Sequence, residues 1–239
     1  MAGARMMVAI DLAARAHAPL ASHPLRLQLR VAMLAPRADG LRDGSEADAL
    51  FQLEDRLVPA LEQTADALFV YRILAQGFTH WVFYVPAEKR AAAEQPLATV
   101  GPIAPYRLDW FVEEDASWEQ YGQLFPDRYA MQIIMNRRLL QRREEAGDRA
   151  ELPRPIDHAA TFRTRAAAET ASIALAARGF EVRAPVGRDD GSWLLELVRV
   201  DVCAPPRPDE VSFEILQIIE PLDGDYDGWG AIVVTEPPR

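Results

Sequence analysis

The sequence has one cysteine, Cys203, and only four histidines among 239 residues. A single cysteine cannot form an intrachain disulfide, which fits a reducing compartment such as the cytoplasm. No two histidines stand four residues apart, and Cys203 has no cysteine partner, so common helical and zinc-cluster sites are excluded. Glycine-rich phosphate loops and Gly-x-Ser-x-Gly elbows are also missing. The sequence therefore predicts no metal, no cofactor and no recognisable catalytic centre.

Long apolar runs are missing as well. The longest uninterrupted ones are short, such as Ala231–Val234, whereas a membrane-spanning helix needs about 20 apolar residues. Met6–Ile10 follows Arg5 but is interrupted by Asp11, and a secretory signal needs about 7–15 apolar residues. We therefore expect a cytoplasmic protein without a membrane partner, whose N-terminus is frayed or weakly helical.

Basic charge is scarce relative to acidic charge. The net charge is −10, and residues 1–126 and 127–239 carry equal shares of it. A chain without a strongly basic face is disfavoured as a direct binder of nucleic acid, but it attracts basic protein surfaces. A local basic patch is left open, at Arg137, Arg138, Arg142 and Arg143.

The length and the hydrophobic content of 49% are sufficient for two cores of ordinary size. In the first half, Leu25–Leu34 alternates apolar and polar residues, which is typical of a half-buried strand. A helix is expected from Ser45, with leucines at helical spacing and Pro59 as a bend or break. The remaining elements expected in this half are strands at Ala67–Leu74, Thr79–Val85 and Tyr106–Val112, and a helix at Pro86–Glu94.

The second half repeats this order. Its expected strands are Ile156–Phe162, Gly179–Ala184, Trp193–Val202 and Gly228–Thr235, with helices at Thr164–Arg178 and from Pro208. The last strand is apolar on both faces, which predicts a central place in its sheet. A helix over Pro126–Arg143, with an apolar stripe at Tyr129, Ile133, Ile134 and Met135, is expected to bridge the halves before a linker at Gly147–Pro155.

Both halves thus show the order β-α-β-β-α-β. This order predicts two tandem ferredoxin-like α+β domains with antiparallel sheets, at residues 1–126 and 127–239. The repeat lies in the order of elements and not in residue identity, so duplication and coincidence both stay open.

Three features of the second half could carry chemistry. His158 shares a strand face with Ala160 and Phe162, which favours a buried or partner-facing ring over a general base. Asp223–Gly228 opens like a calcium loop, but position twelve is Val234 where a glutamate is needed, which favours a plain acidic turn. Trp229 lies between two glycines and is either a core residue or an interface anchor.

The second half also resembles a known family. Several segments carry the likeness: Asn136-Arg137-x-Leu139, Gly147-Asp148, Pro153–His158, Phe162, Gly179-Phe180, Gly191-x-Trp193 and Asp225–Gly230. Together they resemble the RraB family of regulators of ribonuclease E activity, over about residues 128–236. The resemblance implies a ferredoxin-like sandwich that binds ribonuclease E and damps its cleavage of RNA without a cofactor. The first half, through Trp110–Tyr121 and Leu124–Asp127, looks like the uncharacterised domain family often fused ahead of RraB-like domains.

The leading hypothesis is a non-catalytic regulatory protein that binds a protein partner, which the resemblance implies is a ribonuclease. Its expected contact residues are Asp225, Tyr226, Asp227 and Trp229, with His158 as a neighbour, because aromatic side chains supply buried area and acids supply steering. An alternative is an enzyme or small-molecule-binding dimer with a pocket lined by His80 or His158. A third is an assembly protein whose exposed sheets pair into homodimers.

Overall fold

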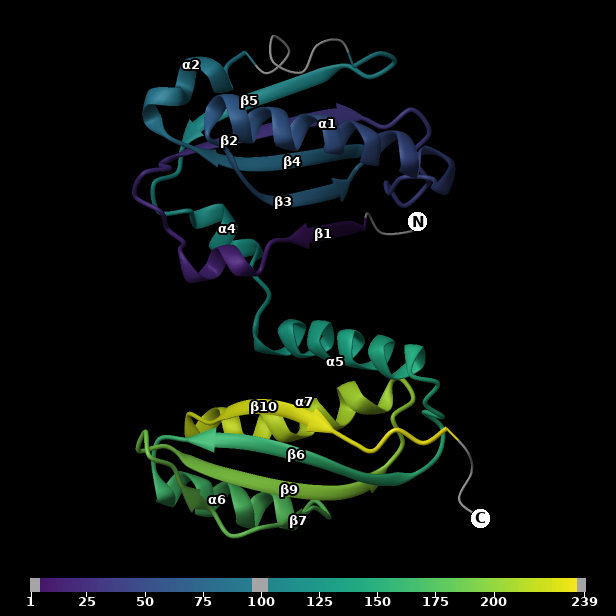
Figure 1. Ribbon diagram of the computed structural model, residues 1–239, viewed down its shortest axis with the longest axis vertical. Helices are drawn as coiled ribbons and strands as arrows, with labels where there is room; N and C mark the ends of the chain where they lie inside the picture. Colours follow the sequence, from purple (N-terminus) through teal and green to yellow (C-terminus); the bar gives the residue numbers. More distant parts are fainter. Residues whose placement is uncertain (1–4, 96–102, 236–239) are drawn as a thin grey trace. The chain divides into compact units, whose positions relative to one another are not determined.

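The computed structural model describes residues 5–95 and 103–235, and the chain divides into two units, Met1–Phe125 and Pro126–Arg239. Each unit has helices on one five-stranded antiparallel sheet (Figure 1). The expected α+β class, with two ferredoxin-like sandwiches, is confirmed. In the described part of the chain, no helix has the length and apolar character to span a bilayer.

The sheet of the first unit has the strand order β1-β3-β4-β2-β5. Without β1, this is the antiparallel order of a ferredoxin-like sandwich. The strands are β1 Met6–Ile10, β2 Leu25–Ala32, β3 Leu68–Ala75, β4 Phe78–Val85 and β5 Leu108–Glu114. The helices are α1 Ala47–Ala65, α2 Arg90–Ala93 and α4 Glu119–Leu124.

Helix α1 covers one face of this sheet. Its leucines at helical spacing, among them Leu57 and Leu61, are fully buried against alternate residues of β2, such as Leu27 and Leu29. The helix continues through Pro59 without a break. Pro59 lies on the exposed side, where water can solvate the carbonyl that loses its N–H partner.

The N-terminal segment is a strand, so the expectation of a frayed or weakly helical segment is wrong. Met6–Ile10 pairs antiparallel with β3, and Val8 and Ile10 pack into a second apolar cluster of the first unit. The intrinsic strand propensity of a five-residue segment is too weak to predict that it forms a strand. The backbone groups at the edge of β3 stabilise it, and they come from residues far along the chain.

This second cluster lies on the sheet face opposite α1. Trp118 stacks on Tyr84 with 4.0 Å between ring centroids, and Tyr121 packs edge-on against Trp118. The Trp118 indole N–H donates to the carbonyl of His23 at 2.9 Å, and the Tyr84 hydroxyl donates to Asp115 at 2.6 Å. The aromatic motif before α4 therefore closes part of the open face of its own sheet.

The sheet of the second unit has the order β10-β6-β9-β7, again ferredoxin-like, with β8 paired to β9. Its strands are β6 Arg154–Phe162, β7 Glu181–Val182, β8 Val186–Gly187, β9 Trp193–Asp201 and β10 Asp225–Gly230. Its helices are α5 Arg128–Glu145, α6 Arg165–Ala176 and α7 Arg207–Ile219. Helices α6 and α7 cover one face, where Phe162, Leu195 and Ile215 form part of the core.

The expectation that the last strand is central is wrong. The last strand lies at the edge of the sheet and ends at Gly230, and Ile232 beyond it is 81% exposed. An apolar sequence on both faces therefore does not mark a central strand here. Helix α5 packs on α7 of its own unit, and its buried side chains are the polar Gln132, Asn136 and Arg143. Met135, expected in an apolar stripe, is half exposed.

Candidate partner-docking surface of the second unit

The edge strand β10 carries the residues expected to contact a partner. Asp225, Tyr226, Asp227 and Trp229 are all on this strand, and Trp229 stands opposite His158 of β6. A β-bulge between Tyr226 and Gly228 leaves Asp227 as the extra residue. Gly228 has a φ of 108°, which only glycine adopts without strain. The acidic turn of the sequence is thus a bulged edge strand.

His158 is a core residue, since only 5% of it is exposed. Its Nδ1 lies 2.7 Å from the Tyr226 hydroxyl, and its ring meets Phe180 edge-on. Burial, with a smaller contribution from the nearby Arg199 guanidinium, lowers the pKa of His158 to about 4, so the ring is neutral at neutral pH. Burial likewise raises the pKa of Tyr226. This pair therefore joins β10 to β6 from the helix-covered side.

Trp229 is held within its own unit by a buried polar seam. Its indole N–H donates to Asn136 Oδ1 at 2.8 Å, and Asn136 is buried. Asn136 also accepts from Gln132 at 2.8 Å and donates to Asp209 at 2.7 Å. This network fixes α5 against β10 and α7. Trp229 is therefore neither a plain core residue nor a free anchor, and it also lines a groove of about 300 Å³ beside α5.

Replacing Trp229 with phenylalanine should lower the unfolding free energy by about 1 kcal/mol, because buried Asn136 loses one hydrogen bond while the aromatic bulk stays. Urea unfolding of the full chain measures the loss. Trp193→Phe makes the same ring change on β9 and serves as the control. Equal losses in both variants would contradict a specific role for the indole N–H.

The sheet face opposite α6 and α7 gathers acidic side chains. Side chains alternate along a strand, so residues of β6 and β9 that flank the buried positions point away from the helices. On this face lie Asp157, Glu181, Glu196, Asp225 and Asp227, together with Arg183 after the end of β7, which contacts Glu196 at 3.0 Å. We call this set the acidic sheet face. Asp157, Glu196, Asp227 and Arg183 line a hollow of about 300 Å³ on it.

Apolar side chains lie between these acids. Val200 of β9 is 65% exposed and Val186 of β8 is 58% exposed, and both point to the acidic sheet face by their register. Burial raises the pKa of Asp227, against a smaller opposing effect of Arg188. A face that mixes exposed valines with carboxylates offers both buried area and electrostatic steering.

Residues expected to form a linker instead form a buried ion cluster. Asp148, 1% exposed in its side chain, contacts Arg143 at 2.8 Å and Arg154 at 2.5 Å. Arg154 also donates to the carbonyl of Arg149, and Arg143 to that of Ala231 at 2.7 Å. Burial alone would raise the pKa of Asp148, but the Val234 N–H and the two guanidiniums hold it below its usual value. Arg143 is therefore not available to a basic patch.

Gly147-Asp148 and Arg154 belong to the segments that carry the family likeness. They do not by themselves predict a buried ion cluster, because a Gly-Asp step followed by Pro153 and Pro155 is equally typical of a linker. Only contacts with the chain segment around Val234 show that these residues are buried.

His80 lies on β4 of the first unit, with Nδ1 2.8 Å from the Gln28 amide nitrogen. Burial, with a contribution from Arg30, lowers its pKa. His80 is not among the residues that line the five best-formed hollows of the described residues, and among these hollows His158 borders the one on the acidic sheet face. Within the same residues, no three His, Cys, Asp or Glu side chains cluster as metal ligands would.

Comparison with known proteins yields two family matches. A family of unknown function (DUF695) matches residues 2–125, and a family described as regulator of ribonuclease activity B (RraB) matches residues 133–231. No curated protein matches the chain. Among solved structures, a candidate glycine cleavage system transcriptional repressor is 8% identical over 87% of this chain and 98% of its own, with a TM-score of 0.25. An unknown protein from Galdieria sulphuraria is 12% identical over 86% and 98%, with a TM-score of 0.22. Similarity this low carries no argument.

Proposed function

Because the chain belongs to the DUF695 family through its first unit and carries an RraB domain in its second, we propose that it is a non-catalytic regulatory protein that damps a ribonuclease by direct contact. The RraB description links the second unit to regulation of ribonuclease activity. The observation that carries the proposal further is the acidic sheet face, which lies within the same domain.

A ribonuclease must present basic surface to hold the phosphates of RNA. The acidic sheet face offers exposed carboxylates, and Val200 and Val186 beside them would be buried on contact. Opposite charges steer the two proteins together, and the apolar residues give the complex its lifetime. A bound regulator would then occupy surface that RNA needs, which lowers cleavage without any reacting group on this chain. Ribonuclease E is the proposed enzyme, following the family resemblance.

Within this face, β10 supplies the rim. Asp227 and Asp225, which contacts Arg128 at 3.4 Å, are exposed and would contribute to steering, whereas Tyr226 and His158 would hold the strand in position. Trp229 is assigned a positioning role through Asn136, with its groove-lining surface as a secondary contact.

The test is RNA cleavage by purified ribonuclease E with increasing amounts of the full chain. The double variant Asp157→Lys/Glu196→Lys reverses charge at the centre of the acidic sheet face. We expect its inhibition constant to rise by about tenfold or more, and wild-type inhibition to weaken as salt is raised.

The matched control is Glu144→Lys/Glu145→Lys, which changes the net charge equally at the exposed end of α5. Basic residues at a helix C-terminus are favourable, so this variant should fold and inhibit like the wild type. Equal loss in both double variants would mean that only net charge matters. Unchanged cleavage with excess wild-type protein would refute the proposed function.

A further inference from the structure

Strand β5 forms an outer edge of the sheet in the first unit. In the described residues it pairs only with β2, so its other side presents backbone N–H and C=O groups without a strand partner. Soluble proteins usually protect such an edge by covering it, breaking it or pairing it with another chain. This edge therefore calls for a physical explanation.

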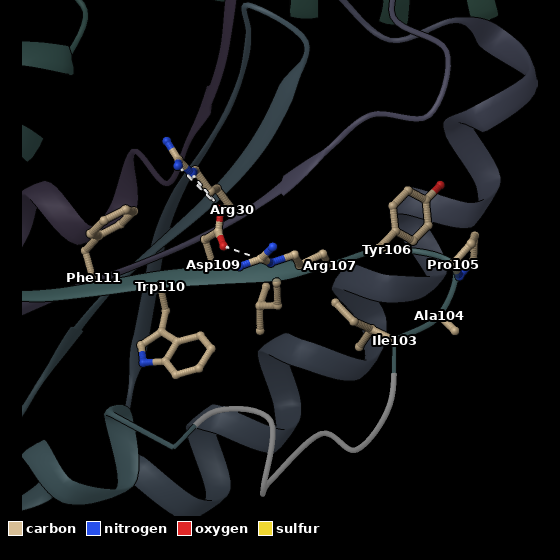
Figure 2. A pocket seen from close by; sticks show the side chains of 10 residues that line it. Arg30, Ile103, Ala104, Pro105, Tyr106, Arg107, Asp109, Trp110 and Phe111 are labelled. Carbon is tan, nitrogen blue, oxygen red and sulfur yellow. Dashed lines mark hydrogen bonds and ion pairs between the residues drawn. The ribbon is translucent and has the colours of Figure 1, made fainter.

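Two aromatic side chains stand at the middle of this edge. Trp110 is 36% exposed and Phe111 47% exposed, and they point to opposite sides of β5 (Figure 2). Both line an open hollow of about 830 Å³ together with Arg30. The Arg30 guanidinium lies 5.2 Å from the centre of the Phe111 ring and 3.4 Å from Asp109. An edge with large aromatic side chains on both sides favours pairing over exposure to water.

A second copy of the chain could pair with this edge through its own β5, and the charged residues of β5 distinguish the possible registers of that pairing. A two-fold axis perpendicular to the sheet keeps every side chain on its own face, so each residue of β5 stands opposite a residue of the same face in the second copy. Because faces alternate along a strand, the residue numbers of such a pair are both even or both odd. Centred on Phe111, this pairing sets Asp109 against Glu113 twice, which is repulsive. Centred on Val112, it sets Glu114 against Trp110 and leaves the carboxylates without a basic residue opposite.

Centred on Trp110, the pairing sets no like charges opposite one another, and Asp109 stands opposite Phe111. Trp110 meets its own copy, and Leu108 meets Val112 on the face that the helices cover. Arg107, which directly precedes β5, meets Glu113 twice on the other face. In the single chain Arg107 is 93% exposed and lies 3.7 Å from Asp109, and Glu113 is 56% exposed and contacts Arg26. Cross-strand aromatic, aliphatic and opposite-charge pairs are all stabilising.

We propose that two copies of this chain associate through antiparallel pairing of β5, with Trp110 on the two-fold axis, and so join their first-unit sheets into one continuous sheet. This surface lies outside the RraB domain and does not depend on the proposed ribonuclease contact. It gives the DUF695 domain a role in assembly.

Charge exchange tests the register. Light scattering of the full chain over a range of concentrations should show a dimer for the wild type. Arg107→Glu and Glu113→Arg should each raise the dimer dissociation constant by about tenfold or more, since each places like charges opposite one another. The double variant Arg107→Glu/Glu113→Arg should restore dimerisation, because opposite charges again face one another.

Disulfide trapping tests the axis independently. The native Cys203 is buried, so an introduced cysteine is the reactive thiol. Trp110→Cys should form a linked dimer under mild oxidation, whereas Phe111→Cys should not, because its copy stands two residues away along the partner strand. A wild-type chain that stays monomeric at every concentration overturns the proposal. A dimer that neither single charge variant weakens, or that Phe111→Cys traps best, overturns it as well.

Discussion

Replacing Asp148 with alanine is expected to lower the unfolding free energy of the second unit by about 3–5 kcal/mol. Arg143 and Arg154 are only 7% and 6% exposed, and the substitution removes the carboxylate that lies between them. It also removes the acceptor of the Val234 N–H, at 2.8 Å. The cost arises mainly from desolvated charge left uncompensated, not from the lost attraction between the ions.

Chemical denaturation of the full chain, followed by amide hydrogen exchange to separate the two units, measures this loss. Glu151→Ala removes a neighbouring carboxylate that is exposed and contacts Arg149 at 2.9 Å. Its unfolding should match the wild type. A loss below about 1 kcal/mol for Asp148→Ala would mean that water already solvates the two arginines.

Lowering the pH from 7 towards 4 is expected to destabilise the second unit through His158 by up to about 3 kcal/mol. The folded pKa is about 4 and the unfolded value is 6.5. As the pH falls below 6.5, His158 therefore becomes protonated in the unfolded chain while it stays neutral in the folded chain. The contribution of the neutral His158 ring to the unfolding free energy is complete above pH 6.5 and is lost progressively as the pH falls to about 4.

The measurement compares the pH dependence of unfolding for the wild type and for His158→Gln, again by hydrogen exchange in the second unit. The variant should have a flatter profile between pH 6.5 and 4. Asp148 and Asp201 have lowered pKa values and titrate below this window, and Asp227, with a raised pKa, acts in the opposite direction. Parallel profiles for both proteins would show that folding does not lower the pKa of His158.

Local patterns were sufficient for most of the architecture. Alternation in Leu25–Leu34 and helical spacing of Leu50, Leu53, Leu57 and Leu61 depend only on which side chains lie on the same face. Because each half repeats the same order of elements, the ferredoxin-like arrangement followed and is confirmed by the strand orders of both sheets. The family likeness followed from short motifs such as Asp225–Gly230 and is confirmed by the matches to both halves.

The sequence by itself therefore determined the two-part α+β plan, because periodicity and turn residues act over a few positions. The tertiary structure alone decided that Met6–Ile10 is a strand, that β10 lies at an edge, and that Asp148 is buried. It also decided that Asp157, Glu196 and Asp227 share one face. Each of these depends on groups brought together from distant parts of the chain. Strand pairing, burial and a shared face are properties of such contacts, and no local pattern contains them.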